Sequence, residues 1–187
     1  MDLIFIRHGH GDHLLDYPNR LDTMHPCLTD YGKMQISNLR SQLSFNSDDL
    51  VLVSPTKRTI ESALLLTGST SFTICPLVGP RMFPQNPELP FLKCDYIYTR
   101  EEISSLYKNI TILDLHLECW GEGINRIKQS TFEDYAWKLL NWIQGRYKKV
   151  FIISHDGTIT NYRVLLGEKE LSRNDFLGEA AVYKMNL

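Results

Sequence analysis

The sequence predicts an α/β protein, a three-layer α/β/α sandwich with a mostly parallel central sheet and one irregular segment. Three short apolar runs, residues 3–6, 50–53 and 150–153, have strand character and end abruptly in polar residues. Apolar residues recur at helical spacing in two longer segments, 29–43 and 131–145. Strand and helix patterns thus alternate, as they do where helices join parallel strands.

Length and composition indicate one enzyme-sized domain, residues 1–187. The chain is 43% hydrophobic and 22% charged, which is ordinary for a globular protein. A net charge of −2 argues against nucleic acid or an anionic membrane as a partner. The sequence does not indicate an oligomeric state.

Cysteine usage and the N-terminus favour a cytoplasmic protein. The four cysteines are widely spaced and form no C-x-x-C pair, so we expect free thiols in a reducing compartment. Residues 3–6 are too short for the apolar core of a signal peptide, and no apolar run approaches membrane-spanning length.

In the first half of the chain, the helix predicted over residues 29–43 places Ile36, Leu39 and Leu43 on one stripe. The strand at 50–53 then leads directly into a second helix. For that second helix, Ser54 is a suitable N-cap and Pro55 suits the first helical position.

The second helix is expected to end near Gly68, and a strand at 72–75 follows. The helix at 131–145 carries two overlapping capping patterns at its start, Ser130 with Glu133 and Thr131 with Asp134. After the strand at 150–153, the pattern closes with a helix at 158–166 and an edge strand at 181–185.

Basic side chains follow three of the predicted strands. Arg7 and His8 end the first strand, Arg58 lies in the first helical turn after the second, and His155 follows the third. Ligands of open α/β sheets bind outside the carboxyl ends of the strands, so these four side chains can converge. An imidazole can attack phosphorus, guanidinium groups can pair with phosphate oxygens, and Gly9 lets the backbone come close.

Four ordered motifs resemble the histidine phosphatase superfamily, which includes the cofactor-dependent phosphoglycerate mutases. They are Arg7-His8-Gly9, the Pro26-Cys27-Leu28-Thr29-Asp30-Tyr31-Gly32 helix entry, Ser54-Pro55 with Arg58 and Ala63, and Ser154-His155-Asp156-Gly157. The resemblance spans nearly the whole chain. It implies that His8 is a nucleophile that becomes phosphohistidine, while Arg7, Arg58 and His155 hold the transferred phosphoryl group.

The resemblance therefore implies a phosphatase that acts on a small phosphomonoester with no metal and no cofactor. Two guanidinium groups and a second imidazole can stabilise the phosphoryl oxygens without a metal ion. Two alternatives within the family are a phosphoglycerate-type mutase and a non-catalytic member that binds phosphorylated ligands.

The acid that protonates the leaving alcohol is less clearly indicated. Mutase-like members carry a glutamate in a leu-x-glu pattern after the third strand, where this chain has Leu77-Val78-Gly79. Asp156 is the favoured substitute, because acid phosphatases of the superfamily use a His-Asp pair at the last strand. Glu122 is the second candidate, for acid catalysis or substrate binding, because Gly121-Glu122-Gly123 resembles the family's gly-glu-ser loop. Asp156 as a helix cap and Glu122 as a surface turn are the structural alternatives.

Residues 76–120 are predicted to form a substrate cap, because prolines and aromatic residues alternate there. A covering loop that only seals the core is the alternative. Arg81 is the predicted substrate-binding cation of this segment. For Arg81, Lys93 and Arg100 alike, a solvated surface charge is the favoured alternative.

A competing motif overlaps the first strand end. His8, His10, Asp12 and His13 fit H-x-H-x-D-H, the first zinc-ligand signature of the metallo-β-lactamase family. Only a single strand precedes it here, and 187 residues is short for that fold. A polar loop at the rim of the site is the alternative, so we predict no metal.

Overall fold

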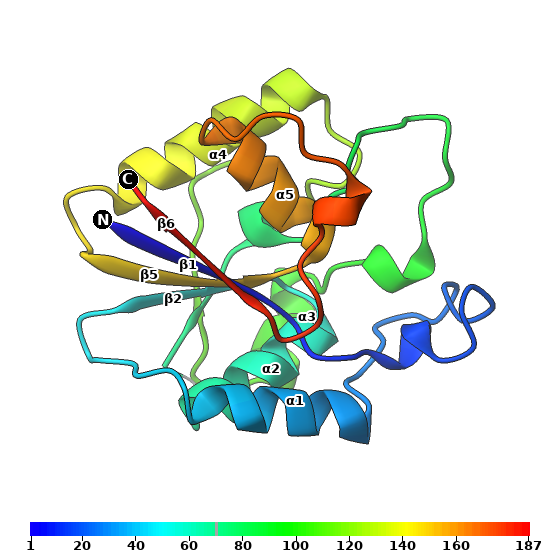
Figure 1. The fold of residues 1–187 in the computed structure, drawn as a ribbon, viewed down its shortest axis with the longest axis horizontal. Helices are drawn as coiled ribbons and strands as arrows, with labels where there is room; N and C mark the ends of the chain where they lie inside the picture. Colours follow the sequence, from blue (N-terminus) through cyan, green and yellow to red (C-terminus); the bar gives the residue numbers. More distant parts are fainter. Residues whose placement is uncertain (70) are drawn as a thin grey trace.

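The computed structural model describes residues 1–69 and 71–187 and has a six-stranded sheet between two layers of helices (Figure 1). The strand order is β4-β3-β2-β5-β1-β6. All neighbours are parallel except β1 and β6, which pair antiparallel. The strands are β1 (Asp2–Arg7), β2 (Leu50–Val53), β3 (Thr73–Ile74), β4 (Thr111–Ile112), β5 (Lys149–Ser154) and β6 (Val182–Asn186). The predicted α/β/α sandwich is confirmed.

Helices cover both faces of the sheet. In Figure 1, α4 and α5 lie above the sheet, and α1 and α2 lie below it. The α-helices are α1 (Asp30–Arg40), α2 (Lys57–Thr67), α3 (Arg100–Leu106), α4 (Gln129–Ile143) and α5 (Asp156–Leu165). Short 3-10 turns occur at η1 (Asp12–Leu14), η2 (Pro76–Val78), η3 (Lys93–Asp95) and η4 (Arg173–Asp175).

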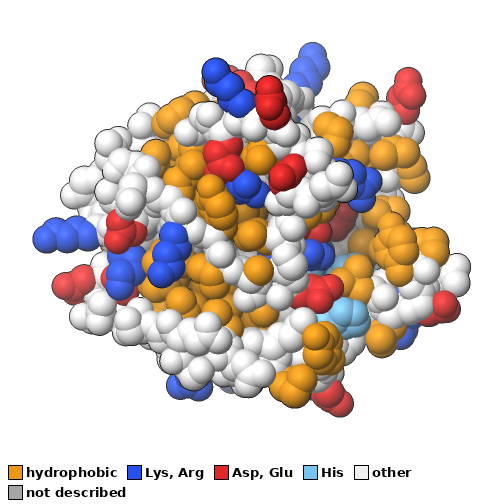
Figure 2. All heavy atoms as spheres, in the orientation of Figure 1, with side chains coloured by type: hydrophobic (Ala, Val, Ile, Leu, Met, Phe, Trp, Pro, Cys, Tyr) orange, Lys and Arg blue, Asp and Glu red, His pale blue; other side chains and the backbone are white. Residues whose placement is uncertain are grey.

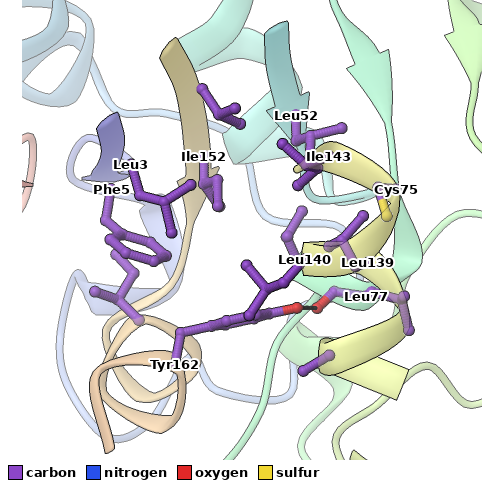
Figure 3. Close-up of a cluster of buried hydrophobic side chains, with 14 of the residues drawn as sticks. Leu3, Phe5, Leu52, Cys75, Leu77, Leu139, Leu140, Ile143, Ile152 and Tyr162 are labelled. Atoms are coloured by element: carbon purple, nitrogen blue, oxygen red, sulfur yellow. Dashed lines mark hydrogen bonds between the residues drawn. The ribbon is translucent and has the colours of Figure 1, made fainter. Parts of the chain in front are cut away.

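Side chains of successive strand residues enter two separate cores. In β1, Leu3 and Phe5 pack with α4 and α5, and Ile4 and Ile6 pack with α1 and α2. This alternation follows from the two-residue period of a strand. The strands are continuously apolar because both faces of the sheet are covered. Figure 3 shows the first core, where Leu3, Phe5 and Ile152 of the sheet meet the α4 and α5 side chains.

Two predicted helix starts were wrong. The N-cap of α2 is Thr56, so Ser54 and Pro55 lie before the helix. Ser54 instead uses its hydroxyl to contact His155 in the candidate site. The helix α4 begins at Gln129 after Lys128, so neither predicted capping pair is used. The predicted end of α2 is confirmed, because its C-cap Gly68 has a φ of 70°.

Three hydroxyl groups of β5 and α5 hold the beginning of the segment 76–120. Tyr162 Oη donates to the Leu77 carbonyl at 3.0 Å, which Figure 3 marks with a dashed line. Ser154 Oγ donates to Val78 O at 2.7 Å, and Thr158 Oγ1 donates to Gly79 O at 2.6 Å. Three consecutive carbonyls are thereby fixed to the strand and helix that carry His155.

The remainder of the segment 76–120 crosses the carboxyl edge of the sheet and returns to it. It is irregular apart from the short turns η2 and η3 up to residue 99, and then forms α3 and the edge strand β4. No helix in the described part of the chain is long and apolar enough to span a membrane.

Candidate active site

The carboxyl ends of β1, β2 and β5 bring the predicted basic side chains together. Arg7 pairs with Ser154 across β1 and β5, so the next residues, His8 and His155, leave the sheet side by side. Their ring centroids are 5.1 Å apart. Arg58 reaches both rings from the first turn of α2.

The His8 ring is held with one nitrogen free of a proton. Its Nδ1 lies 2.7 Å from Gly9 O, a carbonyl that can only accept a hydrogen bond. Arg58 Nε, which can only donate, lies 3.2 Å from His8 Nε2. Nδ1 is therefore the protonated nitrogen, and Nε2 is unprotonated and accepts from Arg58.

The charges around His8 keep this ring neutral. His8 is 3% exposed. Burial lowers the pKa of His8 well below its ordinary value, and the neighbouring Arg58 and Arg7 guanidinium groups lower it further. A neutral imidazole with a free Nε2 lone pair is the form that can act as a nucleophile.

His155 has the complementary orientation. Arg58 Nη2 lies 3.2 Å from His155 Nδ1, so this nitrogen is the acceptor. His155 Nε2 lies 2.8 Å from Ser54 Oγ and carries the proton. Burial and then Arg58 lower the pKa of His155 well below its ordinary value. An anion in the pocket would favour protonation of Nδ1, which would then become a donor to that anion.

Arg58 is the central cation of the site. Its side chain is fully buried, at 1% exposure. Besides the two histidines, its Nη1 donates to Cys94 O at 2.6 Å, and its Nη2 lies 3.4 Å from Asp95 Oδ1. Arg58 therefore connects the strand ends to η3 of the segment that crosses them.

Arg7 approaches the site from β1 with an unsatisfied donor. Its Nη1 donates to Leu177 O at 2.6 Å, and its Nη2 is paired with Asp156 Oδ2 at 2.9 Å. Its Nε is buried without a hydrogen-bond partner among the described residues. Such a group is uncommon in a native structure and is consistent with a site for an anionic ligand.

A cavity of about 370 Å³ opens from these side chains. Its inner end holds the basic groups, and its outer wall is largely apolar. Figure 2 shows hydrophobic side chains gathered beside the histidine surface on the side where the strands end. The lining residues are Arg7, His8, His13, Leu14, Tyr17, Leu21, Arg58, Pro80, Arg81, Met82, Phe83, Leu89, Pro90, Leu92, Cys94, Asp95, His155, Asp156, Gly157, Arg173 and Phe176.

Two further predicted residues lie at this cavity. Asp156, at the start of α5, pairs with Arg7 through Oδ2 and accepts from its neighbour Gly157 N–H through Oδ1 at 2.6 Å. Arg81 is 2% exposed, so the alternative of a solvated surface charge was wrong for this residue. The Arg81 guanidinium donates to Ile124 O and to Gln129 Oε1, so part of its hydrogen-bonding capacity serves the fold.

The predicted residues Gly9 and Glu122 do not line this cavity. A Cβ on Gly9 would lie 2.5 Å from Gly32 O, so the close approach that needs glycine is to α1. Glu122 is exposed and lies in a separate depression with Phe91, Tyr96 and Arg126. The structure therefore does not bring Glu122 to His8.

The H-x-H-x-D-H residues do not meet at one point. His10 Nδ1 lies 3.0 Å from Thr29 Oγ1, and Asp12 Oδ2 accepts from Cys27 Sγ at 3.5 Å. Among residues 1–69 and 71–187, no group of three or more His, Cys, Asp or Glu side chains is arranged to hold a metal ion.

Asp95 and His13 also belong to the site, although the sequence motifs do not indicate them as members of it. Both line the cavity, and His13 lies 6.1 Å from His8 between ring centroids. His13 was considered only as a zinc ligand or rim residue. No motif signals Asp95, because its position depends on how an irregular segment folds back over the sheet.

Comparison with solved structures identifies the fold. An Escherichia coli protein assigned as an alpha-ribazole-5′-phosphate phosphatase superposes with a TM-score of 0.65 at 20% identity, over 100% of this chain and 91% of the other. The ecdysone phosphate phosphatase of Bombyx mori, solved with tungstate, gives 0.66 at 14% identity, over 99% and 88% of the two chains. These neighbours are members of the histidine phosphatase superfamily. The chain has the histidine phosphatase fold.

The phosphoserine phosphatase of Entamoeba histolytica has the same histidine phosphatase fold, with a TM-score of 0.60 at 18% identity over 98% of this chain and 89% of the other. The sequence itself matches no protein-family model and no curated protein. The fold that the four motifs imply is thus confirmed.

Proposed function

We propose that the chain is a metal-independent phosphatase that hydrolyses small phosphomonoesters through a phosphohistidine formed on His8 Nε2. The observation that carries this proposal is the unprotonated Nε2 of a neutral, buried His8 in contact with Arg58. A nucleophile in that state needs no base to activate it. The shared histidine phosphatase fold supports the proposal.

The four basic side chains have complementary roles. His8 Nε2 attacks phosphorus, and Arg7, Arg58 and His155 bind the three phosphoryl oxygens. Phosphoryl transfer depends mainly on positioning and charge stabilisation, which preorganised guanidinium and imidazolium donors supply. The unpartnered Arg7 Nε would gain its hydrogen bond from such an oxygen.

The proposed substrate carries an apolar group on its alcohol side. Beyond the basic end, the cavity wall includes Leu21, Phe83, Leu92 and Phe176. Burial of apolar substrate surface against these side chains would favour binding. Ecdysone phosphate, phosphoserine and glucosyl-3-phosphoglycerate appear in the names of neighbouring phosphatases, so the fold itself leaves the alcohol open. A higher kcat/KM for 2-phenylethyl phosphate than for phosphoserine is the expected outcome.

Turnover and trapping of the intermediate test the function. We expect hydrolysis of 4-nitrophenyl phosphate in excess chelator, competitive inhibition by tungstate, and acid-labile phosphate on His8 in rapidly quenched enzyme. His8→Gln should abolish turnover, because it removes the nucleophile.

His10→Gln is the matched control, because His10 lies on the same loop and contacts Thr29 instead of the cavity. This variant should keep wild-type turnover and the same melting temperature as His8→Gln. Loss of activity in chelator with recovery in zinc would contradict the proposal, as would rapid turnover without any phosphohistidine.

A further inference from the structure

The proposed reaction needs a proton for the leaving alcohol, and the segment that crosses the sheet edge supplies a second carboxylic acid. Asp95 ends η3, at the irregular part of residues 76–120, and lines the cavity with His8. Its side chain is 26% exposed. Asp95 is thus accessible from the cavity, while the preceding residue, Cys94, is buried.

Asn125 fixes the orientation of this carboxyl group. Asn125 Oδ1 accepts from Met82 N–H at 2.8 Å, which leaves its amide nitrogen to donate. That nitrogen, Nδ2, donates to Asp95 Oδ2 at 3.2 Å. Asp95 Oδ2 is thus held as an acceptor, so a proton on this carboxyl group resides on Oδ1, which lies 3.4 Å from Arg58 Nη2.

Arg58 contacts both His8 and Asp95, through different nitrogens of its guanidinium group. Its Nε lies 3.2 Å from His8 Nε2, and its Nη2 lies 3.4 Å from Asp95 Oδ1. These two nitrogens form the fork that binds two oxygens of one oxyanion. A phosphoryl group bound to this guanidinium group would lie within reach of both the nucleophile and Asp95, which line the same cavity.

In-line phosphoryl transfer requires the acid on the side of phosphorus opposite His8, because the attacking and leaving atoms lie on opposite sides of phosphorus. The contact of Asp95 with a different Arg58 nitrogen from the one that meets His8 is compatible with this requirement. Burial favours the protonated acid as well: it raises the pKa of the Asp95 carboxyl, although Arg58 and the Asn125 hydrogen bond act in the opposite direction. A phosphate dianion nearby would favour protonation further, because it is a like charge.

Asp156 lies differently in the same cavity. Its Oδ2 lies 2.9 Å from Arg7 Nη2 and its Oδ1 accepts from the Gly157 amide at 2.6 Å, whereas the corresponding contacts of Asp95 are longer, at 3.4 and 3.2 Å. These contacts suit a residue that positions Arg7 against the phosphoryl group. The sequence-based choice of Asp156 as the acid stays a prediction that the same experiment can test.

We propose that Asp95 is the general acid and base of the phosphatase reaction, an inference that rests on the proposed function. In the first step, the bond from His8 Nε2 to phosphorus forms and the ester P–O bond breaks. The electron pair of that bond stays on the leaving oxygen, which takes the Asp95 proton. In the second step, water attacks phosphorus, the N–P bond breaks back onto His8, and the Asp95 carboxylate takes the proton of the water.

Asp95→Asn removes the acid and keeps the shape of the side chain. With alkyl phosphates, whose leaving alkoxides need a proton, kcat/KM should fall by about 100-fold or more. With 4-nitrophenyl phosphate, whose leaving group departs unaided, the first step should stay near the wild-type rate. The second step still lacks its base, so a burst of about one nitrophenolate per enzyme and accumulated phosphohistidine are expected.

Asp156→Asn and Glu122→Gln are the matched carboxylate controls, measured over the same series of leaving-group pKa values. Both should keep the wild-type dependence on the leaving group, with any loss equal across the series. An equal loss on alkyl and aryl phosphates in Asp95→Asn would show that Asp95 only positions Arg58 and would overturn the assignment.

A steep dependence confined to Asp156→Asn would also overturn it, in favour of Asp156. In either case the wild-type protein still hydrolyses phosphomonoesters, so only the assignment of Asp95 as the acid is contradicted. Absence of wild-type turnover on every phosphomonoester would instead contradict the proposed function. Melting temperatures within about 3 °C of wild type establish that the variants are folded.

Discussion

At the residue scale, Arg58 contacts more members of the candidate site than the other predicted basic side chains, Arg7, His8 and His155, do. It contacts His8, His155, Asp95 and the Cys94 carbonyl from the first turn of α2. Such a buried group is held before any ligand binds, which is what preorganised stabilisation of a phosphoryl group requires. Its contacts also keep η3 against the strand ends.

Arg58→Ala is therefore expected to reduce kcat/KM by more than 100-fold, on the scale of about 3 kcal/mol for one lost oxyanion donor. Arg100→Ala is the control, because Arg100 pairs with Asp114 and stacks over Trp120 outside the cavity. The control should stay within about threefold of wild type. Steady-state rates, with melting temperatures to verify folding, measure both. Equal small losses would show that Arg58 does not meet the phosphoryl group.

At the element scale, the strands and helices outside residues 76–120 were predictable because local patterns specify them, whereas α3 and β4 within that segment were not predicted. The apolar runs of β1, β2 and β5 and the stripe of α1 reflect burial on known faces. The start of α2 was not predictable in the same way. Ser54 is a good cap in isolation, but the fold uses its hydroxyl to orient His155. A contact across 101 residues overrode a local preference.

The hydroxyl contacts that hold residues 77–79 give a stability prediction. Tyr162→Phe leaves the buried Leu77 carbonyl without its donor, so the free energy of unfolding should fall by about 1–2 kcal/mol. Tyr31→Phe is the control, because Tyr31 is 55% exposed, and it should change stability by less than about 0.5 kcal/mol. Urea denaturation measures both variants. Equal stabilities would show that this hydrogen bond contributes nothing net.

At the scale of the whole molecule, the candidate site combines parts that the sequence predicts with parts that it does not. Arg7, His8, Arg58 and His155 follow strand ends, so their convergence follows from parallel topology. Asp95 reaches the site only because an irregular segment folds back across the sheet, where Arg58 binds the carbonyl of the preceding residue, Cys94. Glu122 stays outside for the same reason, since loop conformation is not specified by periodicity.

Bringing three histidines into one buried, cationic region makes the stability of the molecule depend on pH. Burial, Arg58 and Arg7 lower the pKa of His13 to about 3, and burial and the same cations lower the pKa of His8 and His155. Below pH 6.5 the unfolded chain therefore binds more protons than the folded one, and stability falls as pH falls. Asp95 has the opposite effect on the pH dependence of stability, because burial raises its pKa, but one carboxyl group opposes three histidines.

For each histidine that stays neutral in the folded chain, the free energy of unfolding should fall by about 1 kcal/mol between pH 6.5 and 5.5. The three histidines together should lower it by roughly 2–3 kcal/mol over that pH unit. His13→Gln should remove about one third of this slope. His116→Gln, at an exposed position, should leave the slope unchanged. Orthophosphate should flatten the slope, because a bound anion favours protonation of His155. Urea denaturation at pH 7.5, 6.5 and 5.5 measures these slopes, and a stability that stays constant or rises toward pH 5.5 would show that the three rings are not held neutral.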